Sequence, residues 1–316
     1  MTHQFTNHFH SPKDYAAKAR ASIGSHCLTK DFNQAQWFMM GVPDDRGVKN
    51  NYGREGAKEG PRAFREAFYN LSLGSSAPAL GSIYDLGDIK LTQDIASSHE
   101  QLKNIISQIK SIYTQSKILI IGGGHDIAYA EIAGCLSSSK AAHNHHIINL
   151  DAHSDVRPYE ANQVISSGTP FYRLITECGI LGKHYHPFGL QKASNNAQLV
   201  EWMIRQNIAA TWLDDMPTDA QQQEIFSQLI AAMNSIPWHL NVDLDAFAVS
   251  HAPGVSAQAS FGLSPNLLLN LTPYKESLNS LQSLGIYELA PIYDIEHRTA
   301  RLAAKIAYNV MAACKL

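Results

Sequence analysis

Short apolar runs alternate with longer segments of helical periodicity along most of the chain, and this alternation predicts an α/β fold with a mainly parallel sheet. Eight runs have the length and the aliphatic, β-branched character of buried strands. They cover residues 37–42, 83–86, 118–122, 146–151, 188–191, 209–213, 238–243 and 285–289. We therefore expect one large central sheet of eight strands flanked by helices.

The segments between these runs predict six helices. They cover residues 61–71, 95–113, 196–206, 219–233, 265–284 and 298–311. Pro61 and Pro265 suit the first turn of a helix, where the missing N–H is no loss. The Gly- and Asn-rich stretch 46–60 predicts a surface loop. Because no repeat, charge block or Pro/Ser-rich linker marks a boundary, we expect a single domain over residues 1–316, with 1–30 as a peripheral N-terminal segment.

The composition excludes several classes of function. Among 316 residues there are 25 Lys and Arg against 28 Asp and Glu, a net charge of −3. Binders of nucleic acid or anionic membranes usually carry a basic excess, so we expect neither partner. No apolar run approaches the roughly 18 residues of a membrane helix, and the first residues lack the apolar core of a signal peptide. The four cysteines show no CxxC spacing, which favours reduced thiols and a cytoplasmic protein.

Three of the predicted strands are followed by residues of the types that bind metal ions in proteins. Gly-Gly-Gly-His-Asp (122–126) follows the first of them, Asp-Ala-His-Ser-Asp (151–155) the second and Asp-Leu-Asp (243–245) the third. In open α/β sheets, ligands bind at the carboxyl ends of the strands, so we expect these motifs to meet at one edge. Alternation along an extended segment also points Asp151, His153 and Asp155 in the same direction.

The acidic residues of these motifs create a charge problem. Like carboxylates in a partly buried cleft destabilise the fold, and no Lys or Arg lies within the motifs to neutralise them. Two divalent cations solve this problem, with His125 and His153 as neutral imidazole ligands. Such a set suits manganese better than calcium or magnesium, and zinc and iron stay open as alternatives. The carboxylates concerned are those of Asp151, Asp155, Asp243 and Asp245.

Each motif taken alone also has a simpler explanation. Asp-x-Asp after a strand is often a turn or a helix N-cap. Asp-x-His-x-Asp is harder to explain in that way, and the three motifs together favour a metal site. The glycines at 122–124 match neither GxGxxG nor GxxxxGK[ST], which excludes a phosphate-binding loop.

At these residues the sequence resembles the arginase, or ureohydrolase, family, whose metal motifs are GGxH, DAHxD and a later DxD. The resemblance spans nearly the whole chain, because segments 56–62, 252–256 and 288–300 look like further signatures of that family. It implies a three-layer arginase-like fold, two Mn2+ ions per subunit and, since the family commonly forms symmetric oligomers, a homo-oligomer. By the resemblance, one ion would take His125, Asp151, Asp155 and Asp243, and the other Asp151, His153, Asp243 and Asp245.

Within the family, several segments are similar to the formimidoylglutamases of histidine degradation. Residues 166–171 are SSGTPF where arginases and agmatinases carry a histidine before the glycine, and the first metal motif has the GGGH form. Those enzymes hydrolyse N-formimidoyl-L-glutamate to L-glutamate and formamide. The alternatives are a ureohydrolase for a guanidino substrate, of the agmatinase, guanidinobutyrase or arginase type, and a metal-binding homologue without catalysis.

The resemblance also implies roles for individual side chains. Asp155 would take the proton of the nucleophile and deliver it to the leaving nitrogen, and Glu288 would hold the cationic formimino group. Arg54 is the first candidate for the substrate's carboxylates, because a guanidinium binds carboxylate bidentately. Further substrate contacts are expected, by analogy, from Asn50, Ser167, Thr169 and Gln191. The remaining histidines, which include His143, His145, His146, His184, His186 and His251, are interpreted as surface or capping residues.

Overall fold

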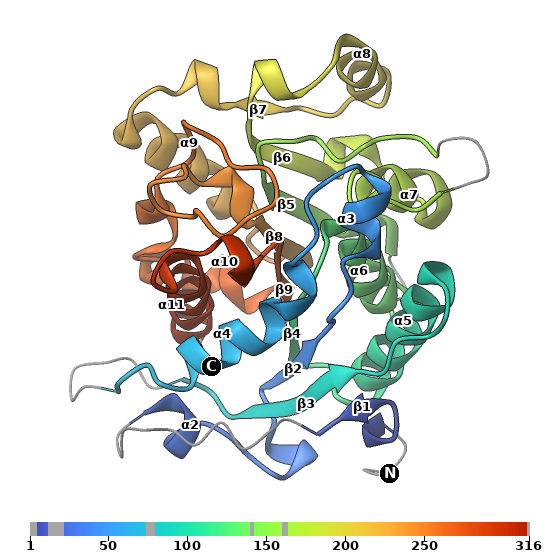
Figure 1. Ribbon diagram of the computed structural model, residues 1–316, viewed down its shortest axis with the longest axis vertical. Helices are drawn as coiled ribbons and strands as arrows, with labels where there is room; N and C mark the ends of the chain where they lie inside the picture. The colour runs from blue at the N-terminus through green and yellow to red at the C-terminus, as the bar shows by residue number, and fades with distance from the viewer. Residues whose placement is uncertain (1–4, 12–21, 74–79, 140–141, 160–163, 315–316) are drawn as a thin grey trace.

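The computed structural model describes residues 5–11, 22–73, 80–139, 142–159 and 164–314. Its centre is a nine-stranded sheet of order β1-β3-β2-β4-β9-β8-β5-β6-β7 (Figure 1). All neighbouring strands are parallel except β1 and β3, which are antiparallel. The strands are β1 (Phe9–His10), β2 (Trp37–Gly41), β3 (Ile83–Ile89), β4 (Lys117–Ile121), β5 (His146–Leu150), β6 (Tyr185–Leu190), β7 (Thr211–Trp212), β8 (Trp238–Asp243) and β9 (Leu281–Tyr287).

Side chains alternate across the strands and build one apolar core on each face of the sheet. In β2, Trp37 and Met39 belong to one core, and Phe38 and Met40 belong to the other. Helices α4 (Gly60–Phe68), α9 (Asp219–Ala231), α10 (Lys275–Asn279) and α11 (Arg298–Ala313) pack on the first core. Helices α5 (Ile95–Ile112), α6 (Ala128–Ser137), α7 (Pro170–Cys178) and α8 (Ala197–Arg205) pack on the second. Two short helices, α2 (Ile23–His26) and α3 (Arg46–Asn50), complete the set visible in Figure 1.

The α/β architecture with a mainly parallel sheet is confirmed, and all eight predicted strands are present. The sheet has a ninth strand, β1, because Phe9 and His10 pair with the edge strand β3. Two residues are too few to show any alternation, so the number of strands predicted from the pattern is one short. The single-domain organisation, with residues 1–30 as a peripheral segment, stays a prediction.

Five of the six predicted helices are present as α4, α5, α8, α9 and α11. The predicted helix over 265–284 is wrong. That segment contains two 3-10 turns, the short helix α10 and the start of β9. Pro273 interrupts any helix in its middle, and from Leu281 the backbone pairs with β8 instead. The loop predicted at 46–60 is partly wrong as well, because it contains α3 and a 3-10 turn.

The pattern of apolar and polar residues does not predict helix α6, because this helix lacks a polar face. Every residue from 128 to 136 is buried between the sheet and the neighbouring helices, so its apolar positions do not recur with a helical period. The four cysteines are free thiols. In the part of the chain that the structure describes, no helix has both the length and the apolar character to cross a bilayer.

Candidate metal centre

Four strands that are adjacent in the middle of the sheet end at the candidate site. β4, β9, β8 and β5 run parallel, so their carboxyl ends meet at one edge. β4 leads into His125, β9 into Glu288, and β8 ends at Asp243. The topology therefore brings together motifs that are more than a hundred residues apart. The other residues at this edge are Asp245 after β8, and Asp151, His153 and Asp155 after β5.

One group of potential ligands surrounds the imidazole of His125. Its Nδ1 lies 3.2 Å from Asp151 Oδ2, 3.0 Å from Asp155 Oδ2 and 3.1 Å from Asp243 Oδ2. All four residues are buried. Their ligand atoms lie within 4.8 Å of one another, close enough for a single ion to bind them all.

A second group lies around His153 and shares Asp151 with the first. His153 Nδ1 is 3.1 Å from Asp245 Oδ2 and 3.5 Å from Asp151 Oδ1. The ligand atoms of these three residues again lie within 4.8 Å of one another. In this arrangement Asp151 is common to both groups, whereas Asp243 belongs to the first alone. The structure thus brings together all six residues predicted as ligands.

The spacing and the unpaired atoms of this cluster fit two divalent ions. Neighbouring ligands of an octahedral ion with bonds of about 2.1 Å stand about 3.0 Å apart, as His125 and its carboxylates do. Among the described residues, His125 Nδ1, Asp245 Oδ1 and Glu288 Oε2 are buried without a hydrogen-bond partner. Buried polar atoms in proteins are nearly always paired, so these atoms indicate a binuclear metal site.

Burial and mutual repulsion change the pKa values of the cluster. Burial, together with the charge of Asp151, raises the pKa of Asp155 to about 6. Burial and the neighbouring Asp245 raise the pKa of Asp243 well above its usual range. The charge of Asp245 in turn raises the pKa of His153 to about 12. The cluster therefore needs positive charge, which protons or divalent ions can supply, and the two compete for the site.

The local backbone explains why Asp occupies the first position of both later motifs. Asp151 Oδ1 accepts a hydrogen bond from the N–H of His153 at 2.7 Å, and Asp243 Oδ1 accepts one from the N–H of Asp245 at 2.9 Å. Both are Asx turns, in which the side chain closes the turn two residues on. The second oxygen of each carboxylate faces His125. The turn interpretation of these motifs is therefore confirmed, and the turns leave the second carboxylate oxygen of each Asp free for a ligand role.

Glu288 is tied to the first metal loop by its backbone and by one carboxylate oxygen. Its N–H donates to the carbonyl of Gly123 at 2.9 Å, and its Oε1 accepts from the N–H of His125 at 3.0 Å. Its Oε2 is the buried oxygen without a partner. Glu288 and Asp155 both have left-handed backbones, with φ of 64° and 47°. Such backbones are strained for residues other than glycine and persist only where the surrounding structure holds them.

The cluster opens into a cavity of about 330 Å³. His153, Asp155, Asp243, Asp245 and Glu288 all contribute to its lining. The rest of the wall comes from residues that follow α3, from the loop around Ser256, and from the segment that begins after β5. This volume suits a small molecule rather than a polymer.

Arg54 lines this cavity, but its guanidinium is already engaged. Nε donates to the carbonyl of Ser256 at 2.8 Å, and Nη2 donates to the carbonyls of Val255 and Ser256 at 3.0 and 2.7 Å. The guanidinium also stacks on the ring of Tyr293 at 4.2 Å. These contacts join two loops at the rim of the cavity and use the N–H groups of Nε and Nη2, which leaves fewer donors for a substrate carboxylate.

The other predicted substrate contacts fall into two sets. Ser167 lines the cavity, and its Oγ accepts a hydrogen bond at 3.0 Å from Asn51, which also lines the cavity. Asn50, Thr169 and Gln191 are absent from the lining and use their side chains on backbone carbonyls instead. Their partners are Ile165 for Asn50 at 2.8 Å, Ser166 for Thr169 at 2.7 Å and Phe261 for Gln191 at 2.9 Å.

Several cavity residues are missing from the sequence predictions, and two of them have side chains that suit a polar substrate. Asn51 is one of them, whereas the sequence predicts its neighbour Asn50, which does not line the cavity. The other is Arg157, whose side chain lies across Gly168 and lines the cavity. Arg157 is exposed, and none of the side-chain hydrogen bonds or ion pairs between described residues involves its guanidinium. Its position two residues after the Asp-x-His-x-Asp motif was a signal that could have identified it.

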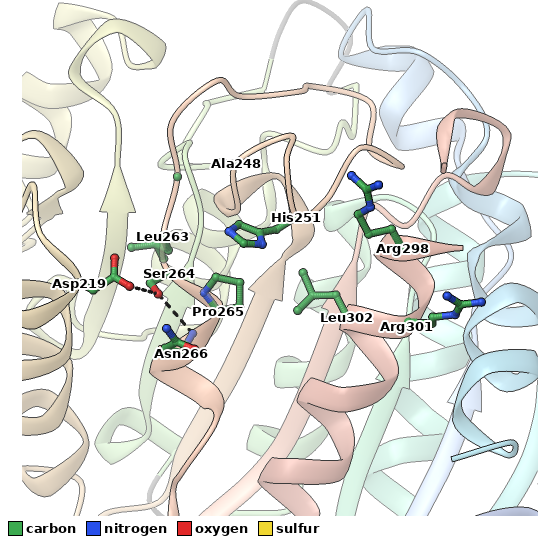
Figure 2. Close-up of a pocket in the computed structure, with 11 residues that line it drawn as sticks. Asp219, Ala248, His251, Leu263, Ser264, Pro265, Asn266, Arg298, Arg301 and Leu302 are labelled. Atoms are coloured by element: carbon green, nitrogen blue, oxygen red, sulfur yellow. Dashed lines mark hydrogen bonds between the residues drawn. The ribbon is translucent and has the colours of Figure 1, made fainter. Parts of the chain in front are cut away.

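A larger cavity, of about 610 Å³, lies between residues 248–266 and the start of α11 (Figure 2). Figure 2 shows Asp219 hydrogen-bonded to Ser264, and the side chains of Arg298 and Arg301 extending in different directions. Within the described ranges, no group of potential metal ligands lies there. The smaller cavity is the candidate active site because it contains the ligand cluster.

Comparisons with known proteins bear on this site. Residues 35–313 match the family described as Arginase family. Formimidoylglutamase from Vibrio vulnificus (strain CMCP6) is 32% identical over 291 residues, which cover 86% of this chain and 82% of that protein. The structure of formimidoylglutamase from Bacillus subtilis has a TM-score of 0.83 and 25% identity, and covers 100% of this chain and 99% of its own. Trypanosoma cruzi formiminoglutamase with Mn2+2 has a TM-score of 0.79 and 25% identity, covering 92% and 97%.

Proposed function

This chain belongs to the arginase family, and from that premise we propose that it is a dimanganese formimidoylglutamase. The arginase-like fold and the buried His/Asp cluster are those of a metallohydrolase of this family. The proposed reaction is the hydrolysis of N-formimidoyl-L-glutamate. The oxygen of water adds to the formimino carbon, the bond from this carbon to the glutamate nitrogen breaks, and L-glutamate and formamide leave.

The proposal rests on one observation, which is that two parts of the same small cavity carry opposite charges. Its metal-ligand side presents carboxylates, with Glu288 Oε2 buried and unpaired. Its wall includes the cationic residue Arg157. N-Formimidoyl-L-glutamate has the complementary pattern, with a cationic formimino group and two carboxylates. Agmatine carries no carboxylate, so the guanidinium of Arg157 would have no partner on that substrate.

The donor set supports manganese as the metal. Carboxylate oxygens prefer hard cations, and the imidazoles of His125 and His153 add affinity for first-row transition metals. When bound, two such ions supply a hydroxide nucleophile at neutral pH, because metal coordination lowers the pKa of water towards about 7. The likeness to the Trypanosoma cruzi structure with Mn2+2 supports the same choice.

The protein's own side chains would orient the substrate and move the proton. Glu288 Oε2 is free to accept a charge-assisted hydrogen bond from the formimino nitrogen. Asp155 lines the cavity, and there it takes the proton of the nucleophile and delivers it to the leaving glutamate nitrogen. Arg157 binds a substrate carboxylate through its guanidinium fork. Asn51 and Ser167, which are hydrogen-bonded to each other, contribute polar groups beside it.

A substrate panel tests the proposal. The protein is loaded with Mn2+ and assayed with N-formimidoyl-L-glutamate, agmatine, L-arginine and 4-guanidinobutyrate. We expect formamide release from the first substrate and at most a small rate of urea release from the others. Clear urea release without formamide release would reject the proposal in favour of a guanidino hydrolase. A Ser167→His variant, tested in parallel, measures how far that position controls the choice.

A further inference from the structure

A chain of three buried polar side chains lies directly behind the first metal loop. Asp126 follows the ligand His125 in the 3-10 turn His125–Ile127. Its Oδ2 is 2.9 Å from His99 Nε2, and Arg173 Nη1 is 3.1 Å from His99 Nδ1. Asp126, His99 and Arg173 are 1%, 2% and 6% exposed, so they do not interact with substrate or bulk solvent.

The donors and acceptors of this chain allow one arrangement. Arginine has only donors, so its N–H donates to His99 Nδ1, which therefore carries no proton. The ring proton is then on Nε2 and is donated to Asp126. Arg173 is held in turn by stacking on the ring of Tyr129, with 3.4 Å between the guanidinium carbon and the ring centroid. The Asp126 carboxylate is thus held in its orientation by His99 of α5, and His99 is held in turn by Arg173 of α7.

The other oxygen of Asp126 lies against the wall of the active-site cavity. Oδ1 is packed so tightly on Gly47 and Gly124 that a methyl group at either position would overlap it. The carbonyl of Gly47 accepts the N–H groups of Ser167 at 3.0 Å and Asn51 at 3.1 Å. The 3-10 turn that carries Asp126 also contacts α3 and α7, which lie at the upper right of Figure 1. Asp126 is therefore in contact with both the first metal loop and the segment that supplies Asn51.

We propose that the Asp126–His99–Arg173 chain positions His125, and so controls the affinity of one metal of the pair. His125 belongs to the ligand group of Asp155 and Asp243, and not to the group of His153 and Asp245. The side chain of His153 is 30% exposed. The buried hydrogen bonds behind its loop involve the shared ligand Asp151 and the backbone of Ala152 and Ser154 rather than the His153 ring. Loss of the Asp126–His99 bond therefore affects the His125 site more than the His153 site. The inference concerns metal binding and is independent of which substrate the protein cleaves.

The expected loss of metal affinity can be estimated from other metalloproteins. Residues that orient a metal-bound histidine or carboxylate typically change metal affinity about 10- to 100-fold when they are replaced. We expect a loss of this size for one of the two Mn2+ equivalents of the full-length protein and a change of less than about threefold for the other.

The test is a Mn2+ titration of the wild-type protein and three variants, followed by calorimetry and by the EPR signal of free Mn2+. His99→Asn keeps an acceptor near Arg173 but places no donor at Asp126. His99→Gln restores a donor near the position of Nε2. His145→Asn is the matched control, because His145 is 3% exposed and bonded to a histidine at the other end of the sheet.

The inference is supported if His99→Asn weakens Mn2+ binding at one site, His99→Gln recovers that affinity, and His145→Asn leaves both sites unchanged. Equal weakening of both sites, or no weakening in a folded His99→Asn, overturns it. Thermal unfolding of each variant identifies any that fails to fold. In that case Asp126→Asn, which keeps the shape of the side chain, is titrated in the same way and judged by the same two outcomes.

Discussion

The two ends of the central sheet use histidine in opposite ways. At the carboxyl end, carboxylates surround the imidazoles of His125 and His153 and raise the pKa of both. At the amino end, burial lowers the pKa of His145, His146 and His186 to about 4. Without metal, the histidines at the carboxyl end therefore retain a proton, whereas those at the amino end are neutral. Metal ions at the carboxyl end would replace that proton and bind the neutral imidazoles.

Hydrogen bonding explains the neutral end. His145 Nδ1 is 3.0 Å from His239 Nε2, and His239 Nδ1 is 2.6 Å from Ser283 Oγ. His146 Nδ1 is 2.9 Å from His186 Nε2. A hydrogen bond between two imidazoles needs one of them as an acceptor, and an acceptor nitrogen carries no proton. Protonation of both partners would break these bonds. The presence of carboxylates, rather than the number of histidines, therefore distinguishes a metal site from a structural cluster.

The amino end should lose stability in acid. Burial lowers the pKa of His145 to about 4, against 6.5 for an unperturbed imidazole, so the unfolded state binds more protons between these pH values. Its contribution is complete above pH 6.5 and is lost as the pH falls towards 4, by on the order of 3 kcal/mol. Urea unfolding at several pH values measures this against His145→Asn, which removes this imidazole and keeps its hydrogen-bonded partner His239. Parallel pH profiles for the two proteins would contradict the assignment.

Substrate binding at the carboxyl end should depend on the positive charge of Arg157. At the amino end, the buried cation of Lys117 donates hydrogen bonds to the carbonyls of Asn279 and Leu281. Arg157, in the cavity wall at the carboxyl end, has no such partner among the described residues. A hydrogen bond to a charged group contributes about 1.5–3 kcal/mol, so we expect Arg157→Ala to raise KM about 10- to 100-fold. Arg54→Ala, whose guanidinium is held by loop carbonyls, is the comparison and should change KM less. Steady-state kinetics that show the larger effect for Arg54 would reverse this ranking.

The sequence predicts which residues gather at the candidate metal centre, because parallel strands impose the position of the segments that follow them. Once β4, β5 and β8 are recognised as parallel strands, the motifs that follow them must meet at one edge. The cavity wall is less predictable. Whether Asn50 or Asn51 faces the cavity depends on the direction of side chains at the end of α3, a helix of five residues that shows no periodicity.

The histidine pairs at the amino end could not be predicted either. His145 and His239 meet because β5 and β8 are neighbours in a particular register, which no local pattern in the chain specifies. The same holds for Asp126, His99 and Arg173, which belong to three separate elements. Strand ends can be predicted from the pattern of apolar runs, whereas contacts between elements require the packed structure.

The most direct test of the two-metal centre is a crystal structure of the manganese-loaded protein with an anomalous difference map at the manganese edge. We predict two peaks about 3.5–4 Å apart on either side of Asp151, one near His125 and one near His153, and none at the histidines of the amino end. In crystals of Asp151→Asn both peaks should be lost or strongly reduced. A single peak at the carboxyl end, or manganese bound at His146 and His186 instead, would contradict the assignment.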